Sequence, residues 1–424
     1  MKILVIGAGG REHALTWGLA KNTTIDRLFV APGNAGIGGE ATRVALAADD
    51  VDGLAAFVER ERIDLTVVGP EMPLVAGLAD RLEAAGHAVF GPTADGARLE
   101  ASKAWTKELC LRYEIPTARA VSVRDVDGGN EALGAFDAPF VVKVDGLAAG
   151  KGVVVAQTRN EAETALRTAF VERAFGSAGD VVVIEEYLKG PEVSAFALTD
   201  GRDVLPLVMA QDFKRAEDGD RGANTGGMGA YCPVGFVDAA TEAAIEAIFE
   251  GTVRALRSEG VRYRGVLYAG LILTGDGPKL LEYNCRFGDP ETQAIVPRLA
   301  SDLCQLLLAC TDGTLGGYRA HWRPEACVTG VVASGGYPGP FETGFEIHGL
   351  EAAAEVDGAI VFHAGTQERD GRVVTAGGRV LAVTALGTGV GQARDRAYQA
   401  CSLIRFDAMR YRRDVARRAA EEAT

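Results

Sequence analysis

The chain has 424 residues, of which 47% are apolar and 24% are charged, as in an ordinary globular protein. This length is enough for about three domains, each with its own core. The net charge of −14 disfavours a nucleic acid partner, and no apolar run approaches the ~20 residues that a membrane span needs.

The cysteines and the start of the chain bear on the compartment. Seven scattered cysteines include no Cys-x-x-Cys pair, which argues for reduced thiols and against a zinc site. The sequence enters an apolar strand directly after Met1, so we expect no signal peptide and a cytoplasmic location.

Short apolar strands alternate with helical stretches over residues 1–100. The strands are expected at Lys2–Ile6, Arg27–Val30, Leu65–Val68 and Ala88–Phe90. This alternation predicts a parallel, Rossmann-like α/β domain whose strand ends meet in one crevice. Small residues follow each strand, and they leave room there for a ligand.

The first glycine turn argues against a dinucleotide in this crevice. It lacks the third glycine of the dinucleotide fingerprint, because position 12 is Glu. No acid follows the second strand to hold a ribose hydroxyl. The N–H groups of Gly9 and Gly10, at a helix start, suit a monophosphate instead. Glu71 follows the third strand and could meet ribose hydroxyls or an amine.

The next segment contains a flap-like hairpin. Strands are expected at Phe140–Asp145 and Val153–Ala156, and the loop between them is rich in glycine. It is not a Walker loop, because Gly152 stands where Ser or Thr should follow the lysine. Such a flap could lay N–H groups on phosphates, and Lys143, in an apolar strand, would face an anion. A plain hairpin turn is the alternative.

Residues 222–231 contain four glycines, which indicate either a mobile lid or a closely packed loop. An amphipathic helix is expected from Val234 to about Gly260.

A second hairpin follows. The strand Leu267–Leu273 turns back, and the returning strand places Glu282, Asn284 and Arg286 on one face, with Leu281 and Tyr283 on the other. Oxygen ligands beside a guanidinium suit a divalent cation that carries a phosphate. A solvated strand face is the alternative. Residues 267–273 carry no further acid, so a two-metal cage made of protein ligands is doubtful.

The last hundred residues predict a small antiparallel α+β domain. Strands are expected at Cys327–Ala333, Ile360–His363, Arg372–Thr375 and Val380–Ala385, with a helix from about Val390.

The run NCRFGDPETQ at 284–293 closely resembles the signature of the phosphoribosylamine–glycine ligase family, which are ATP-grasp enzymes of purine synthesis. The runs GAGGREHA, APGNAG, DGLAAGKG and NTGGMGAY fall in the family's order and cover nearly the full length. Ala8 and Phe213 depart from the family, which usually has Asn and His there.

The resemblance implies an N-terminal domain at 1–100, an ATP-grasp domain at 101–325 with a flap at about 117–190, and a C-terminal domain at 326–424. It implies ligation of glycine to 5-phosphoribosylamine through glycyl phosphate, with ATP and Mg²⁺ or Mn²⁺. The expected partners are small molecules only, and the expected assembly is a monomer or weak dimer.

The site residues that the resemblance implies fall into four groups. The catalytic group is Asp212, Lys214 and Arg286, and the metal ligands are Glu282 and Asn284. The ATP-binding group is Lys103, Lys143, Gly150, Lys151, Gly152, Glu185, Tyr187, Leu188 and Glu192. The substrate-binding group is Gly9, Gly10, Asn34, Glu71, Thr93 and Asp289.

Other readings remain. A kinase-like site would need a His-Arg-Asp catalytic loop, which is absent from the sequence. Another ATP-grasp ligase or carboxylase, or a nucleotide sensor without activity, would share the central domain.

Overall fold

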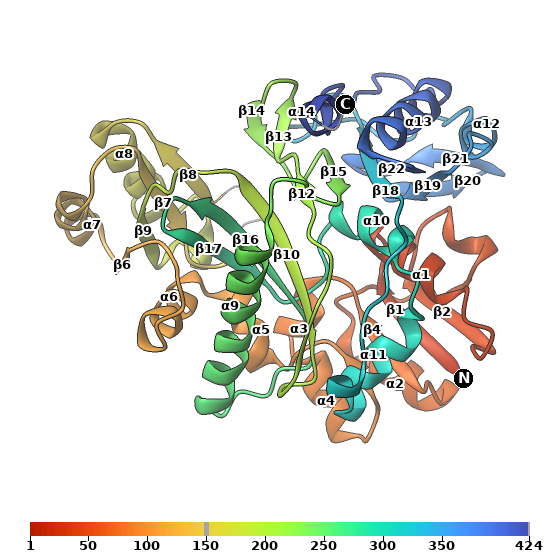
Figure 1. Cartoon of the computed structure of the whole chain (residues 1–424), viewed down its shortest axis with the longest axis horizontal. Coiled ribbons are helices and arrows are strands. Elements are labelled where there is room, and N and C mark those ends of the chain that lie inside the picture. The colour runs from red at the N-terminus through yellow and green to blue at the C-terminus, as the bar shows by residue number, and fades with distance from the viewer. Residues whose placement is uncertain (148–151, 423–424) are drawn as a thin grey trace.

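The structure is a computed structural model that describes residues 1–147 and 152–422. In Figure 1 the C-terminal elements (blue) lie above the N-terminal sheet (red to orange), and the flap strands and helices extend to the left. None of the described helices is long and apolar enough to cross a membrane.

The N-terminal sheet is parallel, as predicted. Its order is β3-β2-β1-β4-β5. The strands are β1 (Lys2–Gly7), β2 (Arg27–Pro32), β3 (Thr42–Arg43), β4 (Leu65–Val68) and β5 (Val89–Phe90), and the helices are α1 (Gly10–Leu19), α2 (Val51–Glu61), α3 (Glu71–Val75), α4 (Leu78–Ala84) and α5 (Ala94–Ala101). The edge strand β3 was not predicted, because its two residues are exposed and carry no apolar signal.

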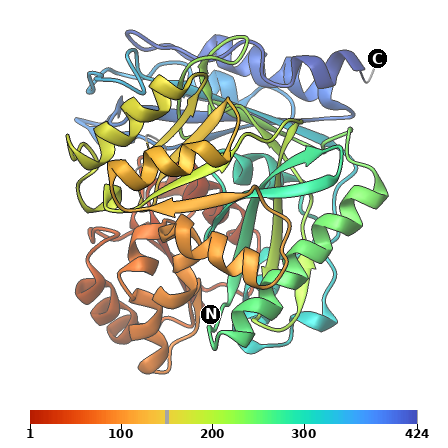
Figure 2. The same ribbon diagram turned by 90° about the vertical axis from the view of Figure 1, so that its left-hand side faces the viewer.

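The flap is an antiparallel sheet of order β6-β9-β7-β8 with its own core. The strands are β6 (Ala120–Val123), β7 (Phe140–Val144), β8 (Val153–Ala156) and β9 (Val182–Glu186). The helices α7 (Val126–Ala132) and α8 (Arg159–Phe170) cover its outer side, which faces the viewer in Figure 2. The two hairpin strands β7 and β8 lie where they were predicted.

The second central sheet has the order β11-β10-β16-β17. Its strands are β10 (Glu192–Thr199), β11 (Val204–Pro206), β16 (Gly265–Thr274) and β17 (Gly277–Asn284), and its helices include α6 (Lys103–Arg112) and α9 (Ala239–Ser258). The β16–β17 register shifts at Gly270, which interrupts the alternation in β17. The core therefore takes Leu280 (1% exposed) and Tyr283 (2% exposed). The prediction that Leu281 shares the face of Tyr283 is wrong, because the bulge turns it toward the cavity described below.

The C-terminal sheet combines two parts of the chain. Its order is β12-β15-β18-β22-β19, and every pair is antiparallel. The strands are β12 (Gln211–Asp212), β15 (Gly229–Cys232), β18 (Ala326–Ala333), β22 (Arg379–Gly387) and β19 (Ala359–His363); α13 (Val390–Leu403) packs on the sheet, and β20 (Thr366–Arg369) pairs with β21 (Arg372–Thr375).

The later part of the glycine-rich stretch is closely packed, as one of the two alternatives predicted. Its last residues form β15, which is buried in that sheet. A Cβ on Gly229 would lie 2.7 Å from the carbonyl oxygen of Thr329, so only glycine allows β15 to approach β18 this closely. The first residues of the stretch, 222–224, are exposed or half-buried and lie in β14 (Arg221–Asn224), which forms a separate hairpin with β13 (Arg215–Glu217).

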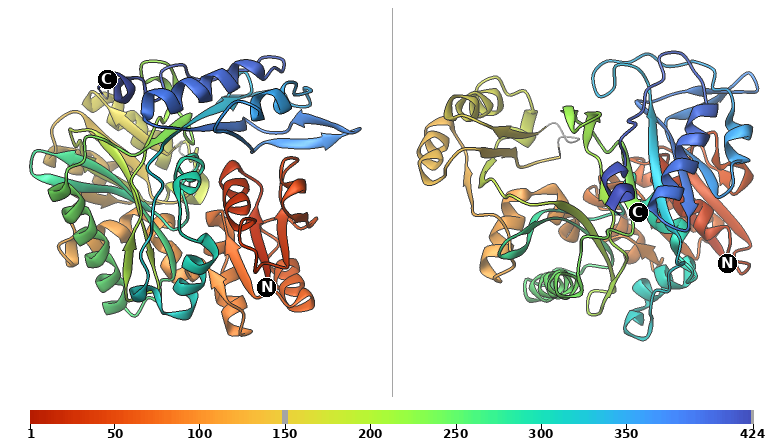
Figure 3. Two further views of the ribbon diagram at one scale, coloured as in Figure 1. Left: turned by 45° about the vertical axis from the view of Figure 1, so that its right-hand side comes forward. Right: turned by 45° about the horizontal axis from the view of Figure 1, so that its top comes forward.

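The three regions meet around one short segment. After β17 the chain forms α10 (Glu291–Ile295), which contacts α1, β15 and β18. It continues through α11 (Leu303–Asp312), which contacts β5. In Figure 3 the C-terminal sheet lies directly over the N-terminal domain. The chain ends in α14 (Arg417–Glu422).

Candidate functional site

A single cavity of about 1820 Å³ opens where these regions meet. Fourteen of the predicted site residues line it: Glu71, Lys103, Lys143, Gly152, Glu185, Tyr187, Leu188, Glu192, Asp212, Lys214, Glu282, Asn284, Arg286 and Asp289. Four do not line it: Gly9, Gly10, Asn34 and Thr93. Gly150 and Lys151 lie outside the residues that the structure describes.

Lysines converge on Glu185 at the flap side of the cavity. Lys143 Nζ lies 3.0 Å from Glu185 Oε2 and also donates to the carbonyl of Leu281. Lys107 Nζ lies 3.1 Å from the same carboxylate oxygen, and burial lowers the pKa of Lys107. Glu185 Oε1 is buried and has no hydrogen-bond partner among the described residues. A buried oxygen without a hydrogen bond is costly, and a donor on a bound ligand could supply that bond.

Sequence reasoning missed Lys107. The available signal was its spacing, because it follows Lys103 by one helical turn and so shares a face of α6. Lys103 Nζ lies 3.4 Å from the carbonyls of Asp145 and Gly146, and burial lowers the pKa of Lys103.

Glu282 is a carboxylate among cations. Its backbone pairs with β16, but its carboxylate has no recorded hydrogen bond or ion pair with any described residue. Burial opposes its ionisation, but the charges of Lys214, Lys143, Lys103 and Arg286 outweigh burial, so the pKa of Glu282 lies below its ordinary value. An ionised carboxylate that is held without a direct partner is free to bind a cation.

Asn284 and Arg286 form part of a second polar group. Arg286 Nη2 donates to Asn284 Oδ1 and to Glu100 Oε1, at 3.0 Å each. Arg286 Nε lies 3.4 Å from Glu71 Oε2. Arg286 therefore connects β17 to α3 and α5, and in this structure its partners are protein oxygens. Glu100 was missed, because nothing local distinguishes it from an ordinary helix acid.

Asp212 and Lys214 flank Phe213 and line the cavity. Lys214 forms an ion pair with Glu192. Burial lowers the pKa of Lys214, but the Glu192 and Asp212 carboxylates outweigh burial, so the pKa lies well above its ordinary value. Burial, reinforced by nearby acids, raises the pKa of Asp212 well above its ordinary value. One of these acids is Glu291, a residue that sequence reasoning also missed; it accepts a 2.6 Å hydrogen bond from Tyr268.

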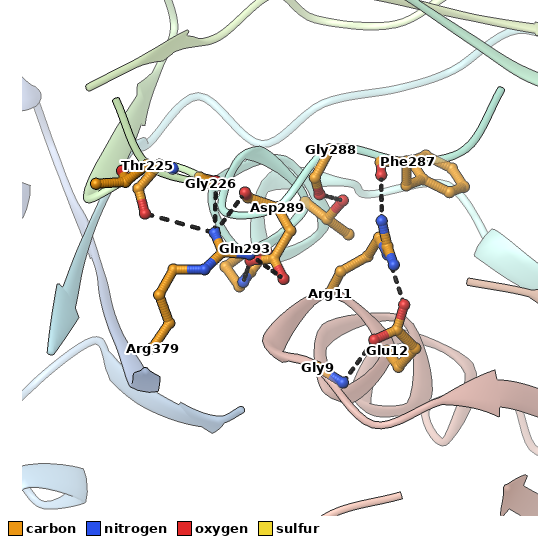
Figure 4. Close-up of polar contacts among 12 residues, drawn as sticks. Gly9, Arg11, Glu12, Thr225, Gly226, Phe287, Gly288, Asp289, Gln293 and Arg379 are labelled. Atoms are coloured by element: carbon orange, nitrogen blue, oxygen red, sulfur yellow. Dashed lines mark hydrogen bonds and ion pairs between the residues drawn. The ribbon is translucent and has the colours of Figure 1, made fainter. Parts of the chain in front are cut away.

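The N-terminal turn differs from the expectation. The Gly9 N–H was predicted to be open to an anion, but it donates to Glu12 Oε2 at 2.6 Å (Figure 4). A Cβ on Gly69 would lie 2.2 Å from Glu12 Oε1, so the small residues at these strand ends make room for Glu12 itself. Arg11 donates to Glu12 and to the carbonyl of Phe287, which joins this turn to the segment that follows β17.

Asp289 lies at the junction of the three regions. Its Oδ1 accepts from Gln293 Nε2 at 2.7 Å, and its Oδ2 lies 3.2 Å from Arg379 Nη2. Arg379 also donates to the carbonyls of Gly226 and Asp289 (Figure 4). Burial opposes ionisation of Asp289, but Arg379 and Arg11 lower its pKa overall. Arg379 was missed because its role depends on tertiary contacts alone.

The remaining predicted residues make structural contacts. Asn34 is buried, and its amide donates to the carbonyls of Ala8 and His363, which ties the second loop to β19. Thr93 donates to the carbonyl of Arg262. Substrate contacts by Asn34, Thr93, Gly9 and Gly10 stay predictions.

Family models match the chain in three consecutive segments. They are described as the N domain, the ATP-grasp (A) domain and the C domain of phosphoribosylglycinamide synthetase, and they match residues 1–100, 101–292 and 327–418.

Relatives match over the full length. Proteins named phosphoribosylamine–glycine ligase from Vibrio vulnificus (strain YJ016) and Salmonella typhimurium are each 49% identical; the alignments cover 99% of this chain and 98% and 99% of those proteins. The crystal structure of phosphoribosylamine–glycine ligase from Thermotoga maritima is 34% identical with a TM-score of 0.87, over 98% of this chain and 100% of that one.

A more distant structure shares the fold alone. The biotin carboxylase domain of the 2-oxoglutarate carboxylase from Hydrogenobacter thermophilus has a TM-score of 0.74 at 16% identity, over 97% of this chain and 91% of that one. The fold by itself therefore does not separate ligases from carboxylases, but the family models and the full-length relatives do. This chain belongs to the phosphoribosylamine–glycine ligase family.

Proposed function

We propose that the central cavity joins glycine to 5-phosphoribosylamine at the expense of ATP, and that the residues lining it carry out the reaction through glycyl phosphate. The chain is an ATP-dependent ligase of purine biosynthesis, as its full-length relatives and domain matches indicate. The observation that carries the assignment of the site is the convergence of lysines, Glu282 and Asp289 on one cavity that all three regions line.

ATP is assigned to the flap side of the cavity. Lys103 and Lys143 would hold its phosphates, and Glu185 Oε1, which lacks a partner among the described residues, would accept from the adenine amine. Tyr187 and Leu188 follow Glu185 at the end of β9 and would border the base. Glu192 would accept hydrogen bonds from the ribose hydroxyls after its ion pair with Lys214 breaks.

A divalent cation, Mg²⁺ or Mn²⁺, fits beside these phosphates. Glu282 is ionised and not directly paired, and Asn284 offers an amide oxygen, which is the oxygen chemistry that these ions prefer. Within the described residues no group of three or more His, Cys, Asp or Glu side chains is arranged to hold a metal. Substrate oxygens and water would complete the coordination. The cation would neutralise charge on the phosphates.

The chemistry explains why both substrates must meet in one cavity. A glycine carboxylate is a poor electrophile, so its oxygen first takes the γ-phosphoryl group and ADP leaves. The amine of phosphoribosylamine then attacks the carbonyl carbon, and phosphate leaves as the amide bond forms. Phosphoryl transfer mainly needs positioning and charge neutralisation, which Lys103, Lys143 and Lys214 supply. The raised pKa of Asp212 lets its carboxyl hold a proton near the reacting groups.

The test is ADP release measured with each substrate omitted in turn. We expect ADP and glycinamide ribonucleotide to form together only when ATP, glycine and phosphoribosylamine are all present. Bicarbonate in place of glycine should not trigger ADP release. ADP release with bicarbonate would favour a carboxylase, and ATP binding without any turnover would favour a nucleotide sensor.

We assign phosphoribosylamine to the side of the cavity near Asp289, and Gly10 gives the first test. A Cβ at Gly10 would lie 2.5 Å from Gln293 Nε2, which holds Asp289. In Gly10→Val this charge-assisted contact, worth about 1.5–3 kcal/mol, is disturbed, so we expect KM for phosphoribosylamine to rise roughly tenfold or more. The Kd of ATP, measured by equilibrium binding, should stay within about twofold of wild type, because the disturbed contact lies outside the region assigned to ATP.

Gly38→Val is the matched control, because a Cβ at Gly38 meets nothing within 4 Å. It should leave both parameters unchanged. A Gly10→Val chain with weakened ATP binding and a normal response to phosphoribosylamine would show that the two sites are reversed.

The boundaries, assembly and compartment remain proposals. We propose parts at 1–100, 101–325 with a flap at about 117–190, and 326–424, working in the cytoplasm as a monomer or weak dimer on small molecules alone. All seven cysteines are buried and unpaired, which supports a reducing compartment. Sedimentation over a range of protein concentrations would test the assembly.

A further inference from the structure

The β13–β14 hairpin forms one wall of the cavity, yet it has little structural support of its own. Its strands pair only with each other among the strands that the structure describes. Asp218, Gly219 and Asp220, in its turn, line the cavity. An isolated two-stranded hairpin is marginally stable in water, so contacts from elsewhere must fix its position.

Those contacts come from the segment 410–414, close to the end of the chain. Arg412 Nη1 donates to the carbonyl of Arg215 at 3.1 Å and to Asp220 Oδ1 at 2.8 Å. Asp414 Oδ2 accepts from the Gly219 N–H at 2.8 Å. The N–H of Arg413 donates to Asp218 Oδ1 at 2.7 Å. Both the base and the turn of the hairpin are therefore bound to this segment.

Arg412 is the centre of this arrangement. It is 2% exposed, and its Nε and Nη2 donate to Asp414 at 2.8 and 2.7 Å. Burial opposes ionisation of Asp414, but these bonds and the Gly219 N–H lower its pKa to about 2, so the pair stays charged at neutral pH. A guanidinium that is buried with carboxylate and carbonyl partners has a fixed orientation.

Arg412 also contacts the segment 212–214, which carries two of the predicted catalytic residues. Its guanidinium carbon lies 4.9 Å from the ring centroid of Phe213, between Asp212 and Lys214. A guanidinium over an aromatic face is attractive. The departure from the usual family residue at this position thus has a structural partner in this chain: Phe213 and the hairpin are held by the same side chain.

We propose that Arg412 is a positioning residue that holds the β13–β14 hairpin and Phe213 in place, and thereby keeps Lys214 aligned and water away from glycyl phosphate. This inference rests on the proposed function. When the wall is loose, water attacks the carbonyl carbon of glycyl phosphate, the bond to the phosphate oxygen breaks, and glycine and phosphate are released. ADP then forms without a matching amount of product.

The test is the ratio of ADP to glycinamide ribonucleotide formed by the full-length chain. We expect a ratio of about one for wild type, as the reaction stoichiometry requires, and a ratio of at least about two for Arg412→Met, with kcat for product lowered roughly tenfold, the size expected for lost charge-assisted bonds. The ratio does not depend on how much of the protein is folded, so general destabilisation alone would not change it.

Arg396→Met is the matched control. Arg396 lies in the same domain and also binds a carbonyl, that of Leu386, and a carboxylate, that of Asp357, but it does not contact the hairpin. Its ratio should stay at one. Asp220→Ala is a milder variant that still tests the proposal if Arg412→Met does not fold. It removes only the turn contact, from a side chain that is 70% exposed, and should raise the ratio by a smaller amount than Arg412→Met.

A ratio of one in both Arg412→Met and Asp220→Ala, measured beside a wild-type chain that makes the product, would overturn the role of Arg412. The proposed function would then still stand. A wild-type chain that releases ADP but makes no product would instead overturn the proposed function, and this inference with it.

Discussion

Glu282→Ala is expected to lower kcat on the order of a thousandfold while the chain stays folded. The carboxylate is ionised and not directly paired, so its loss would remove the proposed ligand of the cation rather than a structural contact. A divalent cation at the phosphates is worth several kcal/mol in the transition state, and each 1.4 kcal/mol is about tenfold in rate. The measurement is kcat at saturating ATP over a range of Mg²⁺ concentrations, together with the melting temperature.

Glu250→Ala is a suitable control for this change. Glu250 is an exposed acid on α9 whose one recorded partner, Arg254, is also exposed. Its removal should alter neither kcat nor the Mg²⁺ dependence. Normal turnover of Glu282→Ala at limiting Mg²⁺ would rule out Glu282 as a metal ligand.

Lys143→Met is expected to weaken ATP binding and turnover by about tenfold or more. The substitution keeps an apolar stem of similar length but removes the charge that lies 3.0 Å from Glu185. One charge-assisted contact contributes roughly 1.5–3 kcal/mol, which is the basis of this magnitude. Equilibrium binding gives the Kd of ATP, and steady-state kinetics give kcat.

Lys279→Met serves as the comparison, because Lys279 lies on β17 outside the cavity lining. It should bind ATP as wild type does. If Lys143→Met matched Lys279→Met in both affinity and rate, the assignment of Lys143 to the phosphates would be incorrect.

The elements near the cavity were predictable where a local pattern determines them. Apolar runs between glycine turns are enough to locate β1, β2 and β4 and to make their sheet parallel. The face of β17 that carries Glu282 and Asn284 follows from alternation over two residues, which the bulge just before them does not alter. The position of Leu281 could not be predicted, because the bulge depends on the pairing with β16.

The partners of the site residues were not predictable, because they come from distant parts of the chain. Arg286 binds Glu100, which is 186 residues away, and Arg379 binds Asp289, which is 90 residues away. Glu12 was recognised only as a break in a dinucleotide fingerprint, although its carboxylate occupies the crevice that the glycines leave open. Residue types and spacing therefore predict many of the side chains that line the cavity, and tertiary packing decides which of them already have protein partners.

The C-terminal sheet, which combines strands from two parts of the chain, constrains the order in which those strands can pair. The strand β12, which bears Asp212, pairs with β15, and β15 is completed on its other side by β18, which begins more than a hundred residues after β12 starts. Such non-local pairing forms late, because a long loop must close first. During synthesis, the nascent chain can build its N-terminal sheet early, but β15, the strand that pairs with β12, lacks its second neighbouring strand until β18 has left the ribosome. We therefore expect the surroundings of Asp212, a predicted catalytic residue, to be completed only after residues 326–333 have been synthesised.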